Sequence, residues 1–321
     1  MIPLALLIAG GAGAVAASLK LFSDATARKS EQAVPRDGEL IDVDGTLVHY
    51  VDKGSGPPIV LIHGLGGQMR NFARVLVDDL ARDHRVILVD RPGSGYSVRP
   101  KGASAGLAAQ AETIAGLIDR LGLERPMLVG HSLGGALSLA VAVHHPQKVG
   151  RLALICPLTQ TQEEVPEPLR GLAIRSEPVR RIVAHTLAVP MGVAARDKLL
   201  KGIFAPEPVP DDFATEGGGA LGLRPSNFYN ASSDMAALED DMPRLVARYD
   251  EVKAPVAILY GRGDNLLDPE VHGTRMKDMV GADVELVEGG HMLPFTQPEL
   301  TARWIRAAAG GNGANGGGHP G

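Results

Sequence analysis

The sequence has a single cysteine and no excess of basic residues, and each shortage excludes a class of protein. Cys156 has no partner within the chain, so disulfides cannot hold the fold together. It lies in an apolar run, where we expect a small buried residue. The 32 Lys and Arg are outnumbered by 37 Asp and Glu, which gives a net charge of -5. Phosphate backbones require clustered Lys and Arg, so nucleic acid is excluded as a main partner.

Charge is also missing from the stretch Ile2 to Leu19, which is followed by basic and polar residues up to Pro35. A helix needs roughly 17–25 apolar residues to span a bilayer, so this stretch is of marginal length. We expect an uncleaved N-terminal anchor and a linker in residues 1–35, and therefore a membrane-associated protein. The sequence does not decide on which side of the membrane the protein lies. The alternative is a cleaved signal with a secreted or periplasmic product, because Ala14-Val15-Ala16 matches a cleavage pattern.

What the sequence does contain is the composition of a globular protein, with 45% hydrophobic and 21% charged residues. Two short apolar segments flank Asp44-Gly45, which is a strong hairpin signal. Apolar runs of strand length then alternate with helical patterns at 107–121 and 133–143, which predicts an α/β fold with a mainly parallel sheet. These runs are Ile59 to Ile62, Val86 to Val89, Met127 to Val129, Leu152 to Ile155, Val256 to Tyr260 and Val284 to Val287.

Strand-like runs disappear between residues 157 and 249, where prolines and glycines separate short pieces with helical spacing. We expect this segment to be a helical lid, inserted into a core made of residues 36–156 and 250–309. The last residues, 310–321, are mostly Gly and Asn without an apolar period, which is typical of a flexible tail.

The candidate nucleophile is Ser132, within Gly130-His131-Ser132-Leu133-Gly134. This G-x-S-x-G pattern lies between a predicted strand and a predicted helix, where a sharp turn presents the serine above the sheet. Because a helix starts there, the Leu133 backbone N–H should face the oxyanion that forms when a serine attacks a carbonyl. The loop His63-Gly64-Leu65-Gly66-Gly67 offers the Leu65 N–H as a second donor, and we expect His63 to be structural.

A serine hydroxyl needs an imidazole to take its proton, and His291 is the candidate base. It follows a late predicted strand, and the preceding Gly289-Gly290 frees its loop to reach over the sheet edge. Asp264 is the candidate acid, and Asp268 in the same loop is the alternate. Ser132, Asp264 and His291 stand in the chain order expected when such loops meet at the carboxyl edge of a doubly wound sheet. We expect the other helical and lid histidines at the surface: His144, His145, His185 and His272.

These motifs, together with Asp90-Arg91-Pro92-Gly93-Ser94-Gly95-Tyr96-Ser97, resemble the α/β-hydrolase fold family in its lid-bearing branch. The similarity covers about residues 40–309. It implies an eight-stranded, mostly parallel sheet, a lid after the sixth strand and cofactor-free ester chemistry through an acyl-enzyme. It also implies a structural role for Asp90. A serine at position 132 argues against the branches similar to epoxide hydrolases and haloalkane dehalogenases, which carry an aspartate there.

We therefore expect a serine hydrolase that cleaves a carboxylic ester, or a related acyl bond, of a small and largely apolar substrate. Leu293 and Phe295, just beyond His291, and Phe228 of the lid are the predicted substrate contacts. Further residues could line an apolar pocket or simply pack the lid: Phe204, Phe213, Tyr229, Met191 and Met235.

The same three catalytic residues would also serve other reactions. An acyltransferase or perhydrolase and a carbon–carbon bond hydrolase are the alternatives within enzymes, and a ligand-binding receptor without turnover is the alternative outside them. The sequence contains no metal-ligand cluster and no phosphate-cradling loop, so we expect no metal and no cofactor. It leaves the oligomeric state open.

Overall fold

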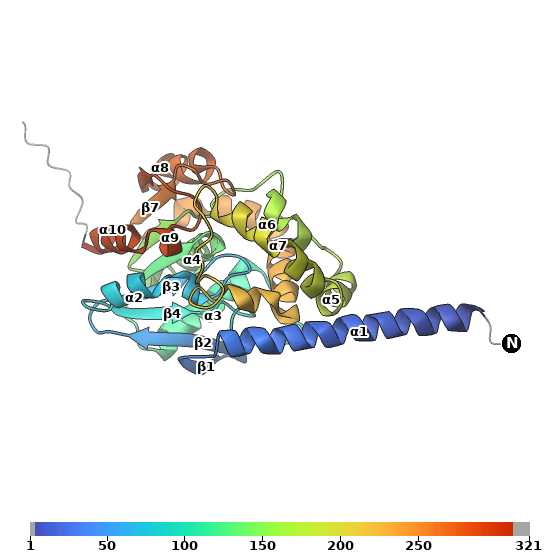
Figure 1. Ribbon diagram of the computed structural model, residues 1–321. Coiled ribbons are helices and arrows are strands. Elements are labelled where there is room, and N and C mark those ends of the chain that lie inside the picture. The colour runs from blue at the N-terminus through green and yellow to red at the C-terminus, as the bar shows by residue number, and fades with distance from the viewer. Residues whose placement is uncertain (1–3, 311–321) are drawn as a thin grey trace, which may run out of the picture.

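The centre of the molecule is an eight-stranded sheet, seen in a computed structural model that describes residues 4–310 (Figure 1). The strand order is β1-β2-β4-β3-β5-β6-β7-β8. β2 runs antiparallel to β1 and β4, and all other neighbours are parallel. The strands are β1 Glu39–Val43, β2 Thr46–Lys53, β3 Pro58–Ile62, β4 Arg85–Val89, β5 Met127–His131, β6 Arg151–Ile155, β7 Val256–Gly261 and β8 Asp283–Val287. The expected eight-stranded, mainly parallel α/β sheet is confirmed.

Helices precede the sheet, connect its strands and close the chain. They are α1 Leu4–Ala33, α2 Arg74–Leu80, α3 Leu107–Arg120, α4 Leu133–His144, α5 Glu177–His185, α6 Ala188–Phe204, α7 Pro225–Val246, α8 Met276–Val280, α9 Leu293–Thr296 and α10 Pro298–Gly310. α4 packs against β3, β5 and β6 with α3 beside it, while α2 and α10 pack against each other. The parallel strands are buried between these layers, which is why they consist of unbroken apolar runs.

The opening hairpin forms where Asp44-Gly45 predicts it. Both residues have positive φ angles, 49° and 87°, as the tight turns that match the twist of paired strands require. The Gly45 N–H donates to the Asp42 carboxylate at 3.1 Å, and Val43 pairs with Thr46 directly across the turn. The turn therefore sets the register of the first strand pair.

Between β6 and β7 the chain forms α5, α6 and α7 with short 3-10 turns, and residues 156–255 contribute no strand. Figure 1 shows these three helices grouped on one side of the sheet. Their place agrees with a helical insertion after the sixth strand. The division into a lid at 157–249 and a core at 36–156 and 250–309 stays a prediction.

The expected N-terminal membrane anchor is wrong. None of the helices within residues 4–310 combines the length and the apolar character needed to cross a membrane. Ala and Gly make up half of the stretch from Ile2 to Leu19, and its helix α1 continues without a break into the charged segment predicted to be a linker. The predicted membrane association and localisation depended on that anchor and are corrected with it.

The second half of α1 packs against the body instead of standing apart from it. Ser23 and Ser30 are buried, Glu31 lies 3.4 Å from the Arg224 guanidinium, and the Tyr96 hydroxyl donates to the Val34 carbonyl at 2.5 Å. Contacts with α5, α6 and α7 complete this packing. The tail expected at 310–321 lies outside the described residues, apart from Gly310 at the end of α10.

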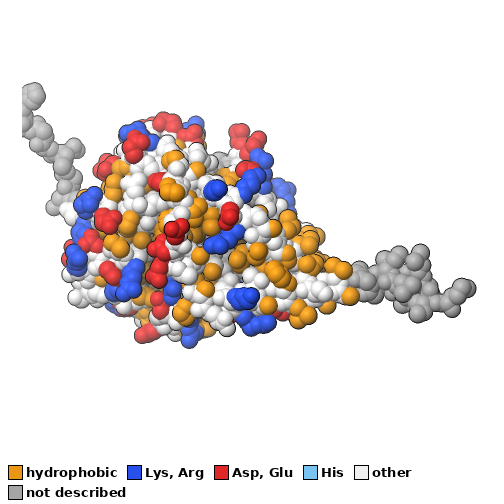
Figure 2. Space-filling model, viewed as in Figure 1, with side chains coloured by type: hydrophobic (Ala, Val, Ile, Leu, Met, Phe, Trp, Pro, Cys, Tyr) orange, Lys and Arg blue, Asp and Glu red, His pale blue; other side chains and the backbone are white. Residues whose placement is uncertain are grey.

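Hydrophobic side chains are exposed where α1 runs beside the inserted helices (Figure 2). The large ones are Val15, Leu21 and Phe22 on α1, Val179 and Ile182 on α5, and Met191 and Val193 on α6, with Leu187 just before α6. A shallow groove of about 460 Å³ between α1 and α6 is lined by Ala14, Val15, Ser18, Leu19, Phe22 and Pro190. α1 thus adds apolar surface to that of α5 and α6.

The contact between α4 and β3 leads to a test of stability. A Cβ on Gly134 would overlap the backbone carbonyl of Ile62, whereas a Cβ on Gly171 would meet nothing within 4 Å. Alanine in place of glycine usually stabilises a helix by up to about 1 kcal/mol, but here the overlap outweighs that gain. We expect Gly134→Ala to lower the free energy of unfolding by about 3 kcal/mol in urea titrations. Gly171→Ala is the matched control and should unfold like the parent; equal stability of the two variants would contradict this packing.

Candidate active site

Ser132 lies on the tight turn between β5 and α4. Its backbone is strained, with φ 55° and ψ -121°, and hydrogen bonds hold it in that conformation. The Ser132 N–H donates to the Ile155 carbonyl at 3.1 Å, and its own carbonyl accepts from Gly135 and Leu158 at 2.9 and 3.0 Å. A side chain at Gly130 would overlap the Gly134 carbonyl, so glycine is required before the serine. The turn presents a half-buried hydroxyl at the carboxyl edge of the sheet.

Asp264 and His291 form a buried hydrogen-bonded pair at the same edge. His291 Nδ1 lies 2.7 Å from Asp264 Oδ2, and Asp264 Oδ1 accepts the N–H groups of Leu266 and Leu267 at 2.9 and 3.1 Å. Burial alone would raise the pKa of Asp264, but the charge and hydrogen bond of His291 and the two N–H donors bring this pKa below its usual value. An ionised carboxylate only accepts, so His291 Nδ1 carries the hydrogen and Nε2 is left free to accept a proton.

The structure joins two of the three predicted catalytic residues directly. Among the described residues, no hydrogen bond links the Ser132 hydroxyl to His291. The neighbouring His131 donates from Nε2 to the His291 carbonyl at 2.9 Å, and the two imidazole rings lie 4.9 Å apart. Asp268, the alternate acid, is exposed and accepts the Glu270 N–H instead. Ser132, His291 and Asp264 therefore remain the predicted triad, and Asp264 is the carboxylate that orients the imidazole.

The glycine loop after β3 lies against the candidate nucleophile. A Cβ built on Gly64 would come within 2.9 Å of Ser132 Cβ and 3.4 Å of Ser132 Oγ. Leu65 follows at once in this loop, and Leu133 is the first residue of α4. Both backbone N–H groups stay predicted donors to an oxyanion, and the close approach of Gly64 is what this prediction requires.

A fully buried arginine that we did not single out from the sequence supports this loop. Arg91 donates through Nε to the His63 carbonyl at 3.0 Å and through Nη2 to the Gly64 carbonyl at 3.1 Å. Its Nη1 donates to Gln110 at 2.9 Å and to Asp234 of α7 at 2.8 Å. The side chain thus ties the glycine loop to α3 and α7. The available signal was a charged residue directly after an apolar strand.

Two further histidines hold the backbone near the site. His63 Nε2 accepts the Arg91 N–H at 3.0 Å, and Nδ1 then donates to the Gly64 carbonyl at 2.8 Å. Burial and the charge of Arg91 lower the pKa of His63 to about 3, so the ring is neutral. Burial together with His291 likewise lowers the pKa of His131 to about 3. Both rings are therefore hydrogen-bonding groups without charge, as we expected for His63.

Asp90 belongs to a second buried pair, with His49. His49 Nδ1 lies 2.7 Å from Asp90 Oδ2, and the N–H groups of Met69 and Tyr96 each donate to the carboxylate at 2.8 Å. Burial would raise the pKa of Asp90, but the His49 hydrogen bond and the neighbouring donors lower it overall. These partners are strand and loop backbone, which agrees with a structural role for Asp90. His49 was missed because a lone histidine in a strand gives no signal of its partner.

Cys156 lies beside the acid and base. Within the described residues, its Sγ, an Asp264 oxygen and a His291 nitrogen lie within 4.8 Å of one another, which is close enough for metal ligands. Burial raises the pKa of the Cys156 thiol, however, and only a thiolate is a good ligand. The sulfur faces the Gly290 carbonyl at 3.7 Å. The chemistry of this group fits a packed thiol next to the Asp264–His291 pair rather than a metal centre.

Leu293 and His272 are both more deeply buried than their sequence context suggests. Leu293 is fully buried in the main core, and its contact with substrate stays a prediction. His272 is not at the surface: its Nδ1 accepts the N–H groups of Thr159 and Gln160, both at 3.2 Å, and burial lowers its pKa to about 4. His272 is held by the segment after β6, more than a hundred residues away in the chain.

The side chains predicted to line an apolar pocket lie in different parts of the structure. Phe295 packs edge-on against Phe213 with ring centres 5.2 Å apart, and Phe204 joins them next to Met292. Of these rings, only Phe295 follows His291 closely in the chain, and it is half-buried, whereas Phe204 and Phe213 are buried. Phe228 is half-buried on α7 and stays a prediction. The remaining candidates lie elsewhere: Met191 is exposed, and Tyr229 and Met235 line two separate clefts.

Comparison with known protein families identifies the family to which this fold and site belong. A family model described as alpha/beta hydrolase fold matches residues 57–298, which include the serine turn, Asp264 and His291. The chain belongs to the alpha/beta hydrolase family. The predicted resemblance is therefore confirmed, and the family match covers most of the length of the chain.

Similar proteins include hydrolases of oxo-dienoic acids. The chain is 31% identical over 270 residues to the 2-hydroxy-6-oxononadienedioate/2-hydroxy-6-oxononatrienedioate hydrolase of Burkholderia vietnamiensis, covering 82% of this chain and 91% of that protein. It is 40% identical over 120 residues to the 2-hydroxy-6-oxo-2,4-heptadienoate hydrolase of Pseudomonas putida, where the match spans 37% of this chain and 44% of that protein. An alpha/beta hydrolase fold protein from Burkholderia ambifaria superposes with a TM-score of 0.69 at 23% identity, covering 84% and 99% of the two chains.

The two loop carboxylates give a matched pair of variants. Asp264→Asn keeps the volume of the side chain but removes the charge that orients His291, so we expect kcat to fall by about 10⁴. Asp268→Asn alters an exposed carboxylate of the same loop and should leave kcat within a factor of two or so of the parent. Steady-state hydrolysis by the two purified variants measures this. A large loss for Asp268→Asn alone would reverse the assignment.

The buried histidines predict how stability depends on pH. The pKa values of His63, His131 and His272 are lowered to about 3, 3 and 4, whereas an unfolded histidine titrates near ~6.5. Below that pH the unfolded chain binds protons that the folded chain does not, so stability falls by up to roughly 1.4 kcal/mol per pH unit for each ring. We expect the free energy of unfolding in urea to drop steeply between pH 6.5 and 4.

His272→Asn is the informative variant for this slope. The asparagine oxygen can accept the same two N–H groups but does not titrate in this range. The free energy of unfolding of this variant should therefore change less steeply with pH than that of the parent. The difference in slope is the contribution of one histidine. An identical pH slope in both proteins would mean that His272 does not contribute.

Proposed function

We propose that this protein is a serine hydrolase in which Ser132 attacks a carbonyl carbon. The observation that supports this most directly is the buried Asp264–His291 hydrogen bond next to the strained serine turn. In this mechanism His291 Nε2 takes the Ser132 proton while Asp264 stabilises the imidazolium that forms. The hydroxyl and the imidazole, which lack a mutual hydrogen bond in the free protein, come together when substrate is bound.

The backbone completes the site in this mechanism. The N–H groups of Leu65 and Leu133 receive the oxyanion, and each such donor contributes about 3 kcal/mol in comparable enzymes. His291 then gives its proton to the leaving group, and the acyl group stays on Ser132. Water, activated by the same imidazole, releases the acid and restores the serine. Arg91 positions the Gly64 carbonyl and with it the Leu65 N–H, so it acts through the backbone.

A carbon–carbon bond beside a ketone is the best supported substrate class. The relative from Burkholderia vietnamiensis, which aligns over 82% of this chain, is named for a 6-oxo dienedioate. Such a compound has no ester, so its hydrolysis must break a carbon–carbon bond next to the 6-oxo carbon. The departing carbon keeps the electron pair of that bond and takes up a proton from His291 to form a C–H bond, while the acyl group stays on Ser132. The electrophile and the acyl intermediate are those of an ester hydrolase.

Ester hydrolysis is the second candidate, and a specific observation favours it. The Arg91 donors near the glycine loop are all directed at protein groups, so this guanidinium is not free to bind a substrate carboxylate. Met292, the residue after His291, is buried in a cluster with Phe204 and Phe213, and the half-buried Phe295 packs against it. These apolar surroundings suit an uncharged acyl group better than a dicarboxylate.

Parallel assays of 2-hydroxy-6-oxononadienedioate and p-nitrophenyl butyrate separate these candidates. We expect the ketone to have the higher kcat/KM, followed by loss of its conjugated chromophore, and Ser132→Ala to lower kcat by at least about 10³ on either substrate. Ser138→Ala, which changes another serine of α4, is the control for damage to the helix. A faster ester would favour the second candidate. Turnover that survives Ser132→Ala, or no turnover of either compound by the parent, would refute the proposal.

A further inference from the structure

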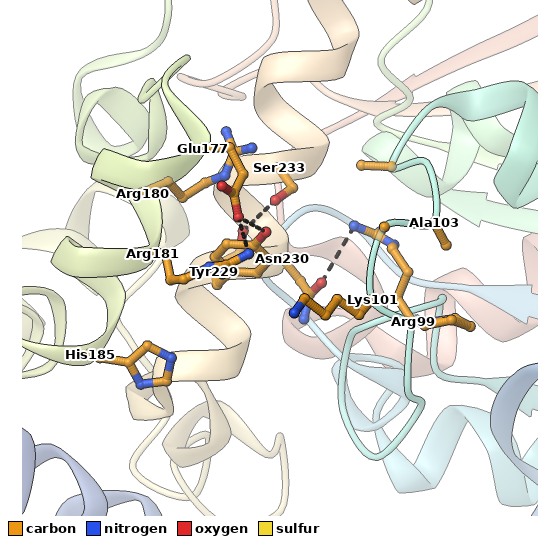
Figure 3. A pocket seen from close by; sticks show the side chains of 13 residues that line it. Arg99, Lys101, Ala103, Glu177, Arg180, Arg181, His185, Tyr229, Asn230 and Ser233 are labelled. Carbon is orange, nitrogen blue, oxygen red and sulfur yellow. Dashed lines mark hydrogen bonds and ion pairs between the residues drawn. The ribbon is translucent and has the colours of Figure 1, made fainter.

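A cleft of about 660 Å³ opens between the loop that follows β4 and the inserted helices α5 and α7. None of Ser132, Asp264 and His291 lines it. Figure 3 shows Arg99 and Lys101 on the loop side, Arg180, Arg181 and His185 on α5, and Tyr229, Asn230 and Ser233 of α7 between them. The cleft is therefore a second concave site on the protein, built by core and inserted helices together.

Positive charge in this cleft exceeds negative charge. Arg181 is matched by Glu177, with which it forms an ion pair at 2.5 Å. Arg99 pairs with Asp234, but that carboxylate also pairs with Arg91, so one carboxylate serves two guanidinium groups. Both Asp234 and Arg91 are buried, and the surplus charge is correspondingly poorly screened.

Two further cations of the cleft have no carboxylate partner among the described residues. Arg180 donates to the Ile174 carbonyl at 2.7 Å, and its guanidinium lies 5.6 Å from the centre of the Tyr229 ring. Lys101 is exposed at the rim and forms no ion pair. The excess over the lining carboxylates is thus carried by Arg180, Lys101 and the shared Arg99.

Unused hydrogen-bond donors accompany this charge. Arg180 is only 7% exposed, yet its buried Nε has no hydrogen-bond partner. The buried Nε of Arg99 is unpaired as well. A buried polar group without a partner costs free energy, and a charged donor costs more, so native proteins pair such groups with protein, water or ligand. Two guanidinium groups that line one cleft with donors to spare indicate a ligand with several acceptor oxygens.

We propose that this cleft binds a small organic anion that carries a phosphate group or more than one carboxylate. Arginine recognises both groups through paired N–H donors, and Lys101 adds a mobile positive charge at the rim. Tyr229, Asn230 and Ser233 also line the cleft, and their polar groups hydrogen-bond to Glu177, Ser226 and the Tyr229 carbonyl, which makes this wall of the cleft polar. The cleft is separate from the candidate active site, since none of Ser132, Asp264 and His291 lines it.

Calorimetric titration of the full chain at low ionic strength tests this proposal. Inorganic phosphate and succinate are the two anionic probes, and glycerol is the uncharged one. We expect saturable binding of at least one anion at millimolar concentration or below, and none of glycerol. Lys101→Ala and Arg180→Gln should each raise Kd by about tenfold or more, because each removes a charged contact.

Matched controls keep the outcomes distinct. Lys201→Ala and Arg196→Gln remove exposed charges of α6 outside the cleft and should leave Kd within about twofold of the parent. Lys101 is exposed, so Lys101→Ala tests the site even if Arg180→Gln fails to fold. Binding of one anion alone supports the site and decides between phosphate and carboxylate. No saturable binding of either anion, or equal weakening by Lys101→Ala and Lys201→Ala, would overturn the proposal.

Discussion

The buried Arg91 guanidinium is the contact on which the arrangement of this protein depends. It lies at the end of β4 and donates at once to the glycine loop after β3, to Gln110 of α3 and to Asp234 of α7. An unpaired buried charge is costly, so these three elements stabilise one another only while all of them are in place. The core, the loop beside Ser132 and the inserted helices are thereby held in one arrangement.

The charges around the site have separate roles because of burial and pairing. Asp264 stays ionised through His291 and two backbone donors, whereas His63 and His131 are buried and neutral. The ionised carboxylate orients a base, and the neutral rings fix backbone carbonyls without adding positive charge. A comparable pair, Asp90 and His49, anchors the loop on the other side of the glycine turn. The same two residue types therefore serve chemistry in one pair under the proposed mechanism and hold backbone in the other.

The fold and the serine turn could be predicted because their signals are local. Apolar runs set the strands, Asp44-Gly45 sets the first hairpin, and glycines flank a serine where a strand meets a helix. Asp264 was ranked above Asp268 from its place after a strand, and its hydrogen bond to His291 agrees. The N-terminal anchor is wrong, because none of the helices in the described part of the chain is long and apolar enough to cross a membrane.

Contacts between distant segments could not be read from the sequence. Arg91 and Asp234 are 143 residues apart, and Gln68 reaches the Gly217 carbonyl across 149 residues. The burial of His272 and Leu293 and the cationic cleft between the β4 loop and α5 arise in the same way. Periodicity and turn chemistry follow from neighbouring residues, so sequence is enough for elements and their order. Burial, charge pairing and cavities depend on which elements meet, and only the tertiary structure decides that.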